Sequence, residues 1–192
     1  MTRPWLTPPT GPAADLADRI AAAVPVIETD RLILRAPNMA DWPAYEAVFT
    51  SDRARFMGGP YTAEAAFNDF AQAVASWLLR GSGAWTITAK GSDEALGWLY
   101  LWQEWSDPEP ELGWVLVEAA EGHGFAEEAA RAVLSLATRL YGAGGFVSYI
   151  DEGNEASARL AGKLGARRDP AAEAAMGEPG LMIYRHQGTR TA

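Results

Sequence analysis

The sequence contains no cysteine among its 192 residues, and it has only two histidines, His123 and His186. The absence of cysteine excludes a thiolate nucleophile, a disulfide scaffold and a cysteine-ligated metal, and two histidines leave little for a histidine-rich metal site. We therefore predict no metal, and a chemistry that depends on carboxylates, hydroxyl groups and the backbone.

Long apolar runs are also absent, since no stretch of about 18 uncharged apolar residues occurs. Residues 1–12 contain Pro and Trp where a signal peptide would have an apolar segment. These absences predict a protein that has no membrane partner, and a cytoplasmic location is the default expectation. The length fits one domain, or one domain with a short arm.

Positive charge is missing from one long stretch, because no Lys or Arg lies between Lys90 and Arg131. The same stretch has ten acidic residues, and the net charge of the whole chain is -9. So acidic a chain is not expected to bind nucleic acid. Without any motif, the simplest explanation is that the charge keeps the protein in solution.

The spacing of apolar residues predicts an order of helices and strands. Helices are expected at residues 13–23, 42–49 (with Asp41 as the N-cap), 63–80, 124–140 and 154–164. Strands are expected at residues 31–35, 85–90, 95–102, 111–117, 146–150 and 181–185. This order predicts an α+β fold with a mixed sheet covered by helices, and residues 1–25 are predicted to form an N-terminal arm with a short helix.

A strand, a short loop and a helix meet at Gly122 and Gly124. Glycines there allow the backbone to approach a ligand, and the free N–H groups of a first helical turn can bind an anion. A dinucleotide fingerprint would need a third glycine in place of Glu127, so an oxidoreductase of that type is disfavoured. Alternatively, the glycines only begin a helix whose first-turn glutamates suit the helix dipole without any ligand.

Four segments, taken in order, resemble the GNAT acetyltransferase superfamily, and more closely its ribosomal-protein N-terminal acetyltransferase-like (RimJ/RimL-type) branch. They are ETDRLILR at 28–35, ELGW at 111–114, GHGFAEEA at 122–129, and Asn154-x-x-Ser157 with Lys163-Leu164-Gly165. The resemblance covers about residues 26–168 in one register. It implies a mostly antiparallel central sheet with a splayed middle and helices on both faces, and residues 26–192 as the acetyltransferase domain. Dimers are common in the branch, so a homodimer is open.

The resemblance implies an N-acetyltransferase that uses acetyl-CoA as co-substrate. The acetyl group would pass to a primary amine, of a protein N-terminus or a small molecule, by direct attack in a ternary complex. The absence of cysteine agrees with direct transfer, because the commonest thiol acyl carrier is missing. The residues implied for acetyl-CoA binding are Val115, Leu116, Val117, Gly122, His123, Gly124, Phe125, Ala126, Asn154 and Lys163.

The parts of acetyl-CoA are assigned to parts of the chain by the same resemblance. Backbone groups of residues 113–117 would hold the pantetheine and polarise the thioester carbonyl, and the amides of residues 122–126 would hold the pyrophosphate. Some cations beyond the acidic stretch are expected to meet the nucleotide phosphates. They are Arg131, Arg159, Lys163, Arg167 and Arg168.

Ser157 is implied as the general acid because it stands at the motif's serine position. Glu111 is the preferred general base, because the matching strand faces the cleft in the branch, and Glu104 is the reserve. Trp102 and Trp105 lie near a strand end beside Glu104, and carboxylates and aromatic faces both favour a cationic amine, so these three residues are predicted to line the acceptor pocket. Of the five tryptophans between residues 85 and 114, about three are expected inside the protein.

Two assignments stay open. Tyr149 is a second choice for the acid, without support from a motif. A non-catalytic acyl-CoA-binding regulatory module of the same fold is the alternative function. Two departures from the superfamily motivate it: Ala119 stands where the superfamily often has Gln or Arg, and Ala166 stands where Phe is expected.

Overall fold

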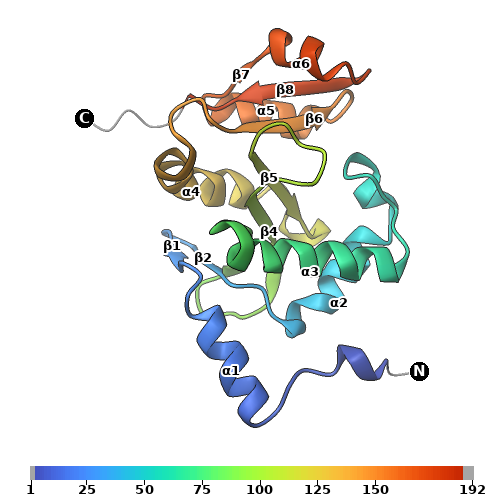
Figure 1. Ribbon diagram of the computed structural model, residues 1–192, viewed down its shortest axis with the longest axis vertical. Coiled ribbons are helices and arrows are strands. Elements are labelled where there is room, and N and C mark those ends of the chain that lie inside the picture. Colours follow the sequence, from blue (N-terminus) through green and yellow to red (C-terminus); the bar gives the residue numbers. More distant parts are fainter. Residues whose placement is uncertain (1–2, 188–192) are drawn as a thin grey trace.

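Eight strands form one sheet in the order β1-β2-β3-β4-β5-β6-β8-β7 in the computed structural model, which describes residues 3–187 (Figure 1). All neighbouring strands are antiparallel except β5 and β6. This arrangement confirms the mixed, mostly antiparallel sheet. The strands are β1 (Ile27–Glu28), β2 (Leu32–Arg35), β3 (Ala84–Ala89), β4 (Ala95–Trp102), β5 (Glu111–Leu116), β6 (Val147–Asp151), β7 (Arg167–Arg168) and β8 (Leu181–Arg185).

Helices cover both faces of the sheet, as expected. Helices α2 and α3 pack on the face that carries Trp98, and α4 packs on the face that carries Trp85. Side chains alternate between the two faces along each strand, which divides the core into these two layers. The described helices are α1 (Pro12–Ala21), α2 (Trp42–Phe49), α3 (Ala63–Arg80), α4 (Phe125–Tyr141), α5 (Glu155–Lys163) and α6 (Pro170–Met176), with 3-10 turns η1 (Pro4–Leu6), η2 (Met39–Asp41), η3 (Asp52–Phe56) and η4 (Glu118–Ala120).

The ends of α3 and the start of α2 are those that the sequence predicts, but Asp41 does not cap α2 with its side chain. The side chain of Thr62 caps α3, and Gly81 ends it with a φ of 73°. Asp41 stands at the N-cap position of α2, but its side chain makes no capping hydrogen bond to that helix. The buried carboxylate instead accepts hydrogen bonds from Arg35 at 2.8 Å and from the hydroxyl group of Thr86 at 2.7 Å. These partners compete successfully for the oxygens that a cap would use.

Three short elements were not predicted from the sequence: β1, β7 and α6. The strands β1 and β7 have two residues each and lie at the two edges of the sheet, where pairing with one neighbour defines them. Such short segments carry too few residues for an apolar period to be recognised.

The N-terminal helix α1 lies at one end of the molecule, at the lower left of Figure 1, and it contains no buried residue. Its apolar side chains Leu16 and Ile20 are 51% and 45% exposed. The predicted helix is confirmed, and the division of the chain at residue 25 stays a prediction. Among the helices of residues 3–187, none combines the length and apolar character that a membrane span requires.

Candidate active site

Strands β5 and β6 diverge at the centre of the sheet. Within residues 3–187 they are paired only at Glu111 and Val147, where the amide of Val147 donates to the carbonyl of Pro110 at 2.9 Å. Beyond that pair, β5 is paired with β4 alone. The predicted splay is therefore confirmed, and it creates an open backbone edge in the middle of the sheet, where a ligand can form hydrogen bonds.

The loop that follows β5 has a backbone that requires glycine. Gly122 and Gly124 have φ angles of 75° and 77°, which other residues rarely adopt. Gly124 is the N-cap of α4, and no side chain caps this helix. The amides of its first turn, at residues 125–127, are therefore available to an anion, and the helix dipole favours negative charge there.

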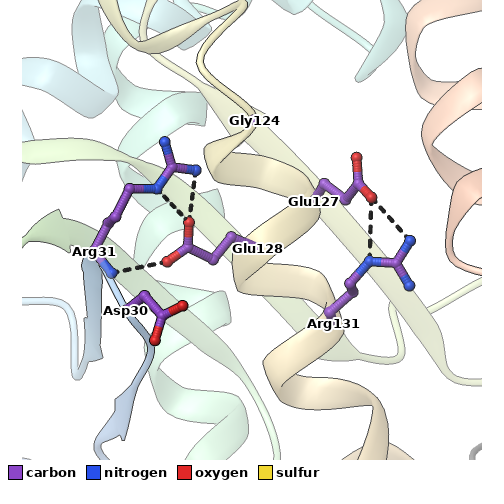
Figure 2. A pocket seen from close by; sticks show the side chains of 6 residues that line it. All are labelled: Asp30, Arg31, Gly124, Glu127, Glu128 and Arg131. Carbon is purple, nitrogen blue, oxygen red and sulfur yellow. Dashed lines mark hydrogen bonds and ion pairs between the residues drawn. The ribbon is translucent and has the colours of Figure 1, made fainter.

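A cleft of about 380 Å³ opens beside the first turns of α4. Figure 2 shows that four of its charged side chains form two pairs, Arg31 with Glu128 and Arg131 with Glu127, and that the carboxylate of Asp30 also lines the cleft. Arg31 donates to Glu128 from Nε at 2.6 Å and from its backbone amide at 2.9 Å, and its guanidinium lies 4.7 Å from the ring centre of Phe125. These contacts attach the β1–β2 turn to the start of α4, so the motif of residues 28–35 and the glycine loop, although far apart in sequence, lie at one site.

Glu128 is the centre of this attachment. Burial opposes the ionisation of Glu128, yet hydrogen bonds from Thr29 and Arg31 outweigh it and lower the pKa of that carboxyl group. The hydroxyl group of Thr29 donates to Glu128 at 2.5 Å. The carboxylate is therefore ionised and fully paired at neutral pH.

The expected phosphate-binding cations are mostly engaged in ion pairs on the protein itself. Glu127 pairs with Arg131 at 2.8 Å and with Lys163 at 3.2 Å, and hydrogen bonds from these two cations lower the pKa of Glu127. Arg159 pairs with Glu155, and Arg168 pairs with Glu173. Of the predicted set, Arg131 and Lys163 lie next to the loop at the start of α4.

Arg53 is a residue of this region that sequence reasoning missed. It lies in η3, donates to the carbonyl of Leu116 at 3.2 Å and forms an ion pair with Glu121. It thereby connects the end of β5 to the loop that contains Gly122. A single arginine in a short 3-10 turn carries no pattern that would have predicted this role.

Four carboxylates on the α2–α3 side of the molecule form a different environment, which we call the acidic cluster: Asp69, Glu104, Asp107 and Glu111. Among the described residues, none of the four forms an ion pair, and their charges act on one another. Removal from water, followed by the charges of Asp69 and Asp107, raises the pKa of Glu104 to about 7. Glu104 is exposed as a residue, so solvent screens part of this shift.

Glu111 has the most perturbed carboxylate of the cluster. Removal from water, followed by the charges of Asp107 and Glu104, raises the pKa of Glu111 to about 8. Its side chain lies over Gly113, because a Cβ added there would stand 3.3 Å from Oε1 of Glu111. Across the sheet Glu111 is paired with Trp102, whose side chain partly offsets this rise in the pKa.

Two buried tyrosines connect β4 to α3 beside the acidic cluster. The hydroxyl group of Tyr100 donates to that of Tyr45 at 3.2 Å, which in turn donates to the carboxylate of Asp69. Burial raises the pKa of both tyrosines, so their hydroxyl groups stay protonated at neutral pH. Asp69 precedes the buried Phe70 in α3. A charged residue next to the apolar stripe of this helix was the sequence signal that could have marked Asp69 as a site residue.

The predicted acid, Ser157, lies half-buried in the first turn of α5. Its amide donates to the side chain of Asn154 at 3.2 Å, which confirms Asn154 as the cap of this helix. The hydroxyl group of Ser157 has no hydrogen-bond partner within residues 3–187, whereas that of Tyr149 is bound to the backbone of Glu109 at 3.2 and 3.3 Å. The role of Ser157 stays a prediction, and so does that of Asn154 toward the cofactor.

The tryptophans divide between core and surface. Trp85, Trp98 and Trp102 are buried, which confirms the expectation of three inside, and Trp114 is partly buried. The structure brings Trp102 to Glu111, but Trp105 is 100% exposed in the loop after β4 and is not buried against the acidic cluster. A role of Trp105 in the acceptor pocket stays a prediction.

Comparison with known proteins places this site in a family. The family model of the acetyltransferase (GNAT) domain matches residues 31–167. An acetyltransferase from Agrobacterium tumefaciens str. C58 is 36% identical, with a TM-score of 0.79, over 85% of this chain and 94% of that chain. A putative GnaT-family acetyltransferase from Bordetella pertussis is 25% identical, with a TM-score of 0.68, over 84% and 99% of the two chains.

A third similar structure is a RimL ribosomal L7/L12 alpha-N-protein acetyltransferase in complex with coenzyme A. It is 17% identical, with a TM-score of 0.64, over 85% of this chain and 98% of that chain, and it shares the fold. The domain match covers the open edge of β5, the loop at Gly122 and the first turn of α4. The chain therefore belongs to the GNAT acetyltransferase family and is an acetyl-CoA-dependent acyltransferase.

Proposed function

We propose that the chain is an N-acetyltransferase that transfers acetyl from acetyl-CoA to a primary amine by direct attack in a ternary complex. The observation that carries this proposal is the acidic cluster, whose carboxylates have no cationic partner among residues 3–187 and whose Glu111 stands where β5 separates from β6. A protonated amine supplies the missing positive charge. Without a cation nearby, the pKa of Glu111 is about 8, so the carboxyl group is mostly protonated at neutral pH. A bound ammonium group would lower that pKa and favour the ionised form, which can accept a proton from the amine.

The start of α4 fits the pyrophosphate of acetyl-CoA. Its first-turn amides have no side-chain cap, and the glutamates around them are already paired with Arg31, Arg53, Arg131 and Lys163. The amides of residues 122–126 would bind the pyrophosphate, and the backbone of Val115, Leu116 and Val117 would bind the pantetheine. His123 stacks on Phe125 with ring centres 5.6 Å apart, which stabilises the loop conformation.

Acetyl-CoA supplies the acetyl thioester when it is bound. During transfer the amine nitrogen forms a bond to the acetyl carbon, and the bond from that carbon to sulfur breaks. Glu111 takes the proton of the ammonium group, with Glu104 as the reserve base, and Ser157 gives a proton to the departing thiolate. The nitrogen loses its second proton as it becomes an amide, and that proton, passed through solvent, restores the hydroxyl group of Ser157. The balance leaves an amide, free coenzyme A and one proton on the base.

The proposed base and acid lie on opposite faces of the sheet. Glu111 shares the face of β5 that carries Val115, toward α2 and α3, because alternate residues of a strand point the same way. Ser157 belongs to α5, whose Ala158 and Ala161 pack with Trp114 on the other face. The open edge between β5 and β6 separates them. An acceptor that enters from the α2–α3 face would therefore meet the thioester from the side opposite Ser157.

We further propose the RimJ/RimL-type branch, on the motifs of residues 28–35 and 154–165. The acceptor would be the α-amino group of a protein or a small amine that carries the same ammonium group. Trp102, Glu104 and Trp105 would line its pocket. Turnover of an amine that survives both Trp105→Ala and Glu104→Gln unchanged would remove these two residues from the pocket.

The test is release of free thiol from acetyl-CoA in the presence of an amine panel of peptides with free N-termini, polyamines and amino sugars. We expect release with at least one class, and an acetylated product by mass spectrometry. Binding of acetyl-CoA without release across the panel would support the non-catalytic module instead. Ser157→Ala with full activity would remove the proposed acid.

One motivation for the module is weakened by packing. Ala166 is buried with Ile150 and Ala161, where a small side chain fills part of the core. Its departure from Phe therefore has a local packing reason and says little about the cofactor.

A further inference from the structure

A second, smaller cavity lies between the β4–β5 loop and helix α6. Its volume is about 190 Å³, whereas pockets for drug-sized ligands begin at roughly 300 Å³, so it suits a group of side-chain size. Its lining is mostly apolar. The lining residues include Pro108 and Glu109 of the loop, Tyr149 of β6, Ile183 of β8, and Ala172 and Met176 of α6.

The cavity lies on the same face of the sheet as the acidic cluster. On β6 and β8, Ile150 and Met182 pack against α5. Neighbouring residues of a strand point to opposite faces, so Tyr149 and Ile183, which are paired across the two strands, point away from α5. That is the face toward which Glu111 points from β5.

The cavity and the acidic cluster also share one segment of chain. Asp107 and Glu111 belong to the acidic cluster, whereas Pro108 and Glu109, which lie between them in sequence, line the cavity. The β4–β5 loop therefore has one side in each site.

Tyr149 attaches this segment to β6 and forms a wall of the cavity. Its hydroxyl group donates to the carbonyl of Glu109 at 3.3 Å and accepts from the amide of the same residue at 3.2 Å. Two residues earlier on β6, Val147 is the strand partner of Glu111. An acceptor whose ammonium group is bound at Glu111 therefore has this cavity as the neighbouring space on the same face.

The charge beside the cavity is neutralised, unlike that of the acidic cluster. Glu109 is the only charged side chain among the described residues that line the cavity. Arg185 donates two hydrogen bonds to its carboxylate, at 2.6 and 2.8 Å. The cavity thus offers no unpaired carboxylate to a second ammonium group.

Helix α6 covers the cavity without filling it. None of the residues of α6 is buried, and polar contacts hold the helix on β8. Asp169 caps it at the amide of Ala172, at 3.1 Å, and accepts from Arg185 at 2.6 Å. Glu173 accepts from the amide of Ile183 at 3.1 Å. Because these contacts fix the helix, its apolar underside is kept in place for a ligand, which lowers the cost of binding.

We propose that this cavity binds the apolar side group of the acceptor, and that the acceptor is a primary amine with one ammonium group and one apolar group of side-chain size. The inference rests on the proposed function, since it places the ammonium group at the acidic cluster. Removal of apolar surface from water favours the side group in the cavity. A second ammonium group would lose its hydration there without a carboxylate to replace it.

Turnover of matched amines tests the chemical class of the acceptor. The thiol assay is run with straight-chain amines from ethylamine to hexylamine, and with 1,6-diaminohexane, which adds a second ammonium group to the same six carbons. We expect kcat/KM to rise about threefold with each methylene group and to be about 30-fold lower for the diamine than for hexylamine. A preference for the diamine would show that the acidic cluster holds both ammonium groups and would overturn the proposal, as would equal values for ethylamine and hexylamine.

Tripeptides with a free N-terminus distinguish the two sources of such an amine. A tripeptide that begins with leucine should have a kcat/KM about tenfold higher than one that begins with glycine. A higher value for the leucine peptide than for hexylamine identifies a protein N-terminus as the source, and the reverse order identifies a small amine. Equal values for two peptides that are both acetylated would contradict an apolar subsite.

Filling the cavity from α6 tests its place in the site. Ala172→Leu should lower kcat/KM for hexylamine about tenfold and leave that for ethylamine within about twofold. Ala174→Leu, on the same helix but exposed and outside the cavity lining, is the matched control and should leave both unchanged. Equal losses for the two amines in Ala172→Leu would refute the subsite. Should this variant fail to fold, Met176→Ala, which removes part of the wall, should lower the preference for hexylamine over ethylamine about threefold, and an unchanged preference contradicts the proposal.

A binding measurement separates failure of this inference from failure of the proposed function. The methyl group of Met176 is followed by NMR in protein labelled at its methionine methyl groups, and Met176→Ala identifies its signal. Hexylamine should shift this signal to saturation, 1,6-diaminohexane should leave it in place, and Ala172→Leu should abolish the shift. A signal that hexylamine leaves unchanged overturns the inference even if amines are acetylated. A shift without thiol release supports the cavity as a binding site and contradicts the proposed transfer.

Discussion

Two groups of acidic residues lie within the same cation-free stretch of sequence and its immediate surroundings, yet their environments are opposite. At the start of α4, Glu127 and Glu128 are each paired with arginine or lysine, and their pKa values are lowered. In the acidic cluster, Glu104 and Glu111 have no such partner among residues 3–187, and their pKa values are raised. The difference arises because the fold places cations from outside the stretch, Arg31 and Lys163, beside the first group only.

This contrast assigns the two halves of the reaction to two charge environments. A paired glutamate contributes little net negative charge, so the loop at Gly122 can accept an anionic pyrophosphate. An unpaired carboxylate attracts a cationic amine, and its raised pKa lets it hold the proton that the amine loses. The net charge of the chain does not distinguish these two groups, of which only the acidic cluster has unpaired carboxylates that would repel an anion.

The largest expected effect comes from removing the base of the acidic cluster. Glu111→Gln should lower kcat/KM for the amine about 100-fold and abolish the ascending limb of its pH profile, which in the unmodified enzyme should rise with an apparent pKa near 8. Steady-state rates from pH 6 to 10 measure both. Glu94→Gln, an exposed turn residue, is the control and should behave as the unmodified enzyme. An unaltered limb in Glu111→Gln would show that another group titrates.

Breaking a pair at the loop should have a smaller effect of a different kind. Arg31→Ala leaves Glu128 without its guanidinium partner, so negative charge accumulates beside the proposed pyrophosphate site. The KM for acetyl-CoA should rise about tenfold, with kcat almost unchanged, and the affinity loss should be visible by calorimetry. Arg19→Ala, in α1, controls for the loss of a surface charge. A fall in kcat without a change in acetyl-CoA affinity would contradict this division of roles.

The two groups should also affect stability in opposite directions with pH. The pKa of Glu111 is raised in the fold, so its stabilising contribution is complete below about 4.5, the unfolded value, and is lost as the pH rises toward 8. We therefore compare the free energy of unfolding of Glu111→Gln with that of the unmodified chain. This difference should be about 1 kcal/mol more favourable to Glu111→Gln at pH 9 than at pH 5, after allowance for screening by solvent. Urea unfolding at the two pH values measures the difference.

Glu128 is the matched opposite case. Its pKa is lowered in the fold, so its contribution is complete above the unfolded value and is lost as the pH falls through the folded value. Glu128→Gln should be destabilised at neutral pH and should approach the unmodified chain in acid. The same pH trend for both variants would refute the contrast between the two groups.

Much of the fold was predictable because long elements carry clear patterns. The apolar stripe of α3 and its Thr62 cap, the strand at residues 95–102, and the cap of α5 at Asn154 follow from local sequence. Asp41 stands at the predicted N-cap position of α2, but its side chain does not cap the helix, because Arg35 and Thr86, which bind it, are brought there by strand pairing.

The site was predictable only where a motif marked it. The glycines of the loop indicated the start of α4, and Glu111 was placed on the strand that opens. The Tyr100, Tyr45 and Asp69 chain joins three separate elements, and no single segment reveals it. Contacts of this kind depend on packing between elements, which local sequence patterns do not report.

The smallest predicted effect sharpens the contrast within the acidic cluster itself. The charge of Glu104 helps to raise the pKa of Glu111, so Glu104→Gln should lower that pKa and shift the ascending limb of kcat/KM by about half a pH unit downward. Glu118→Gln, an exposed change in the same stretch, should leave the limb in place. If Glu104→Gln abolished the limb, Glu104 would be the base and Glu111 the neighbour that tunes it. A downward shift with the limb preserved assigns the proton to Glu111, because only a neighbour can move a titration without removing it.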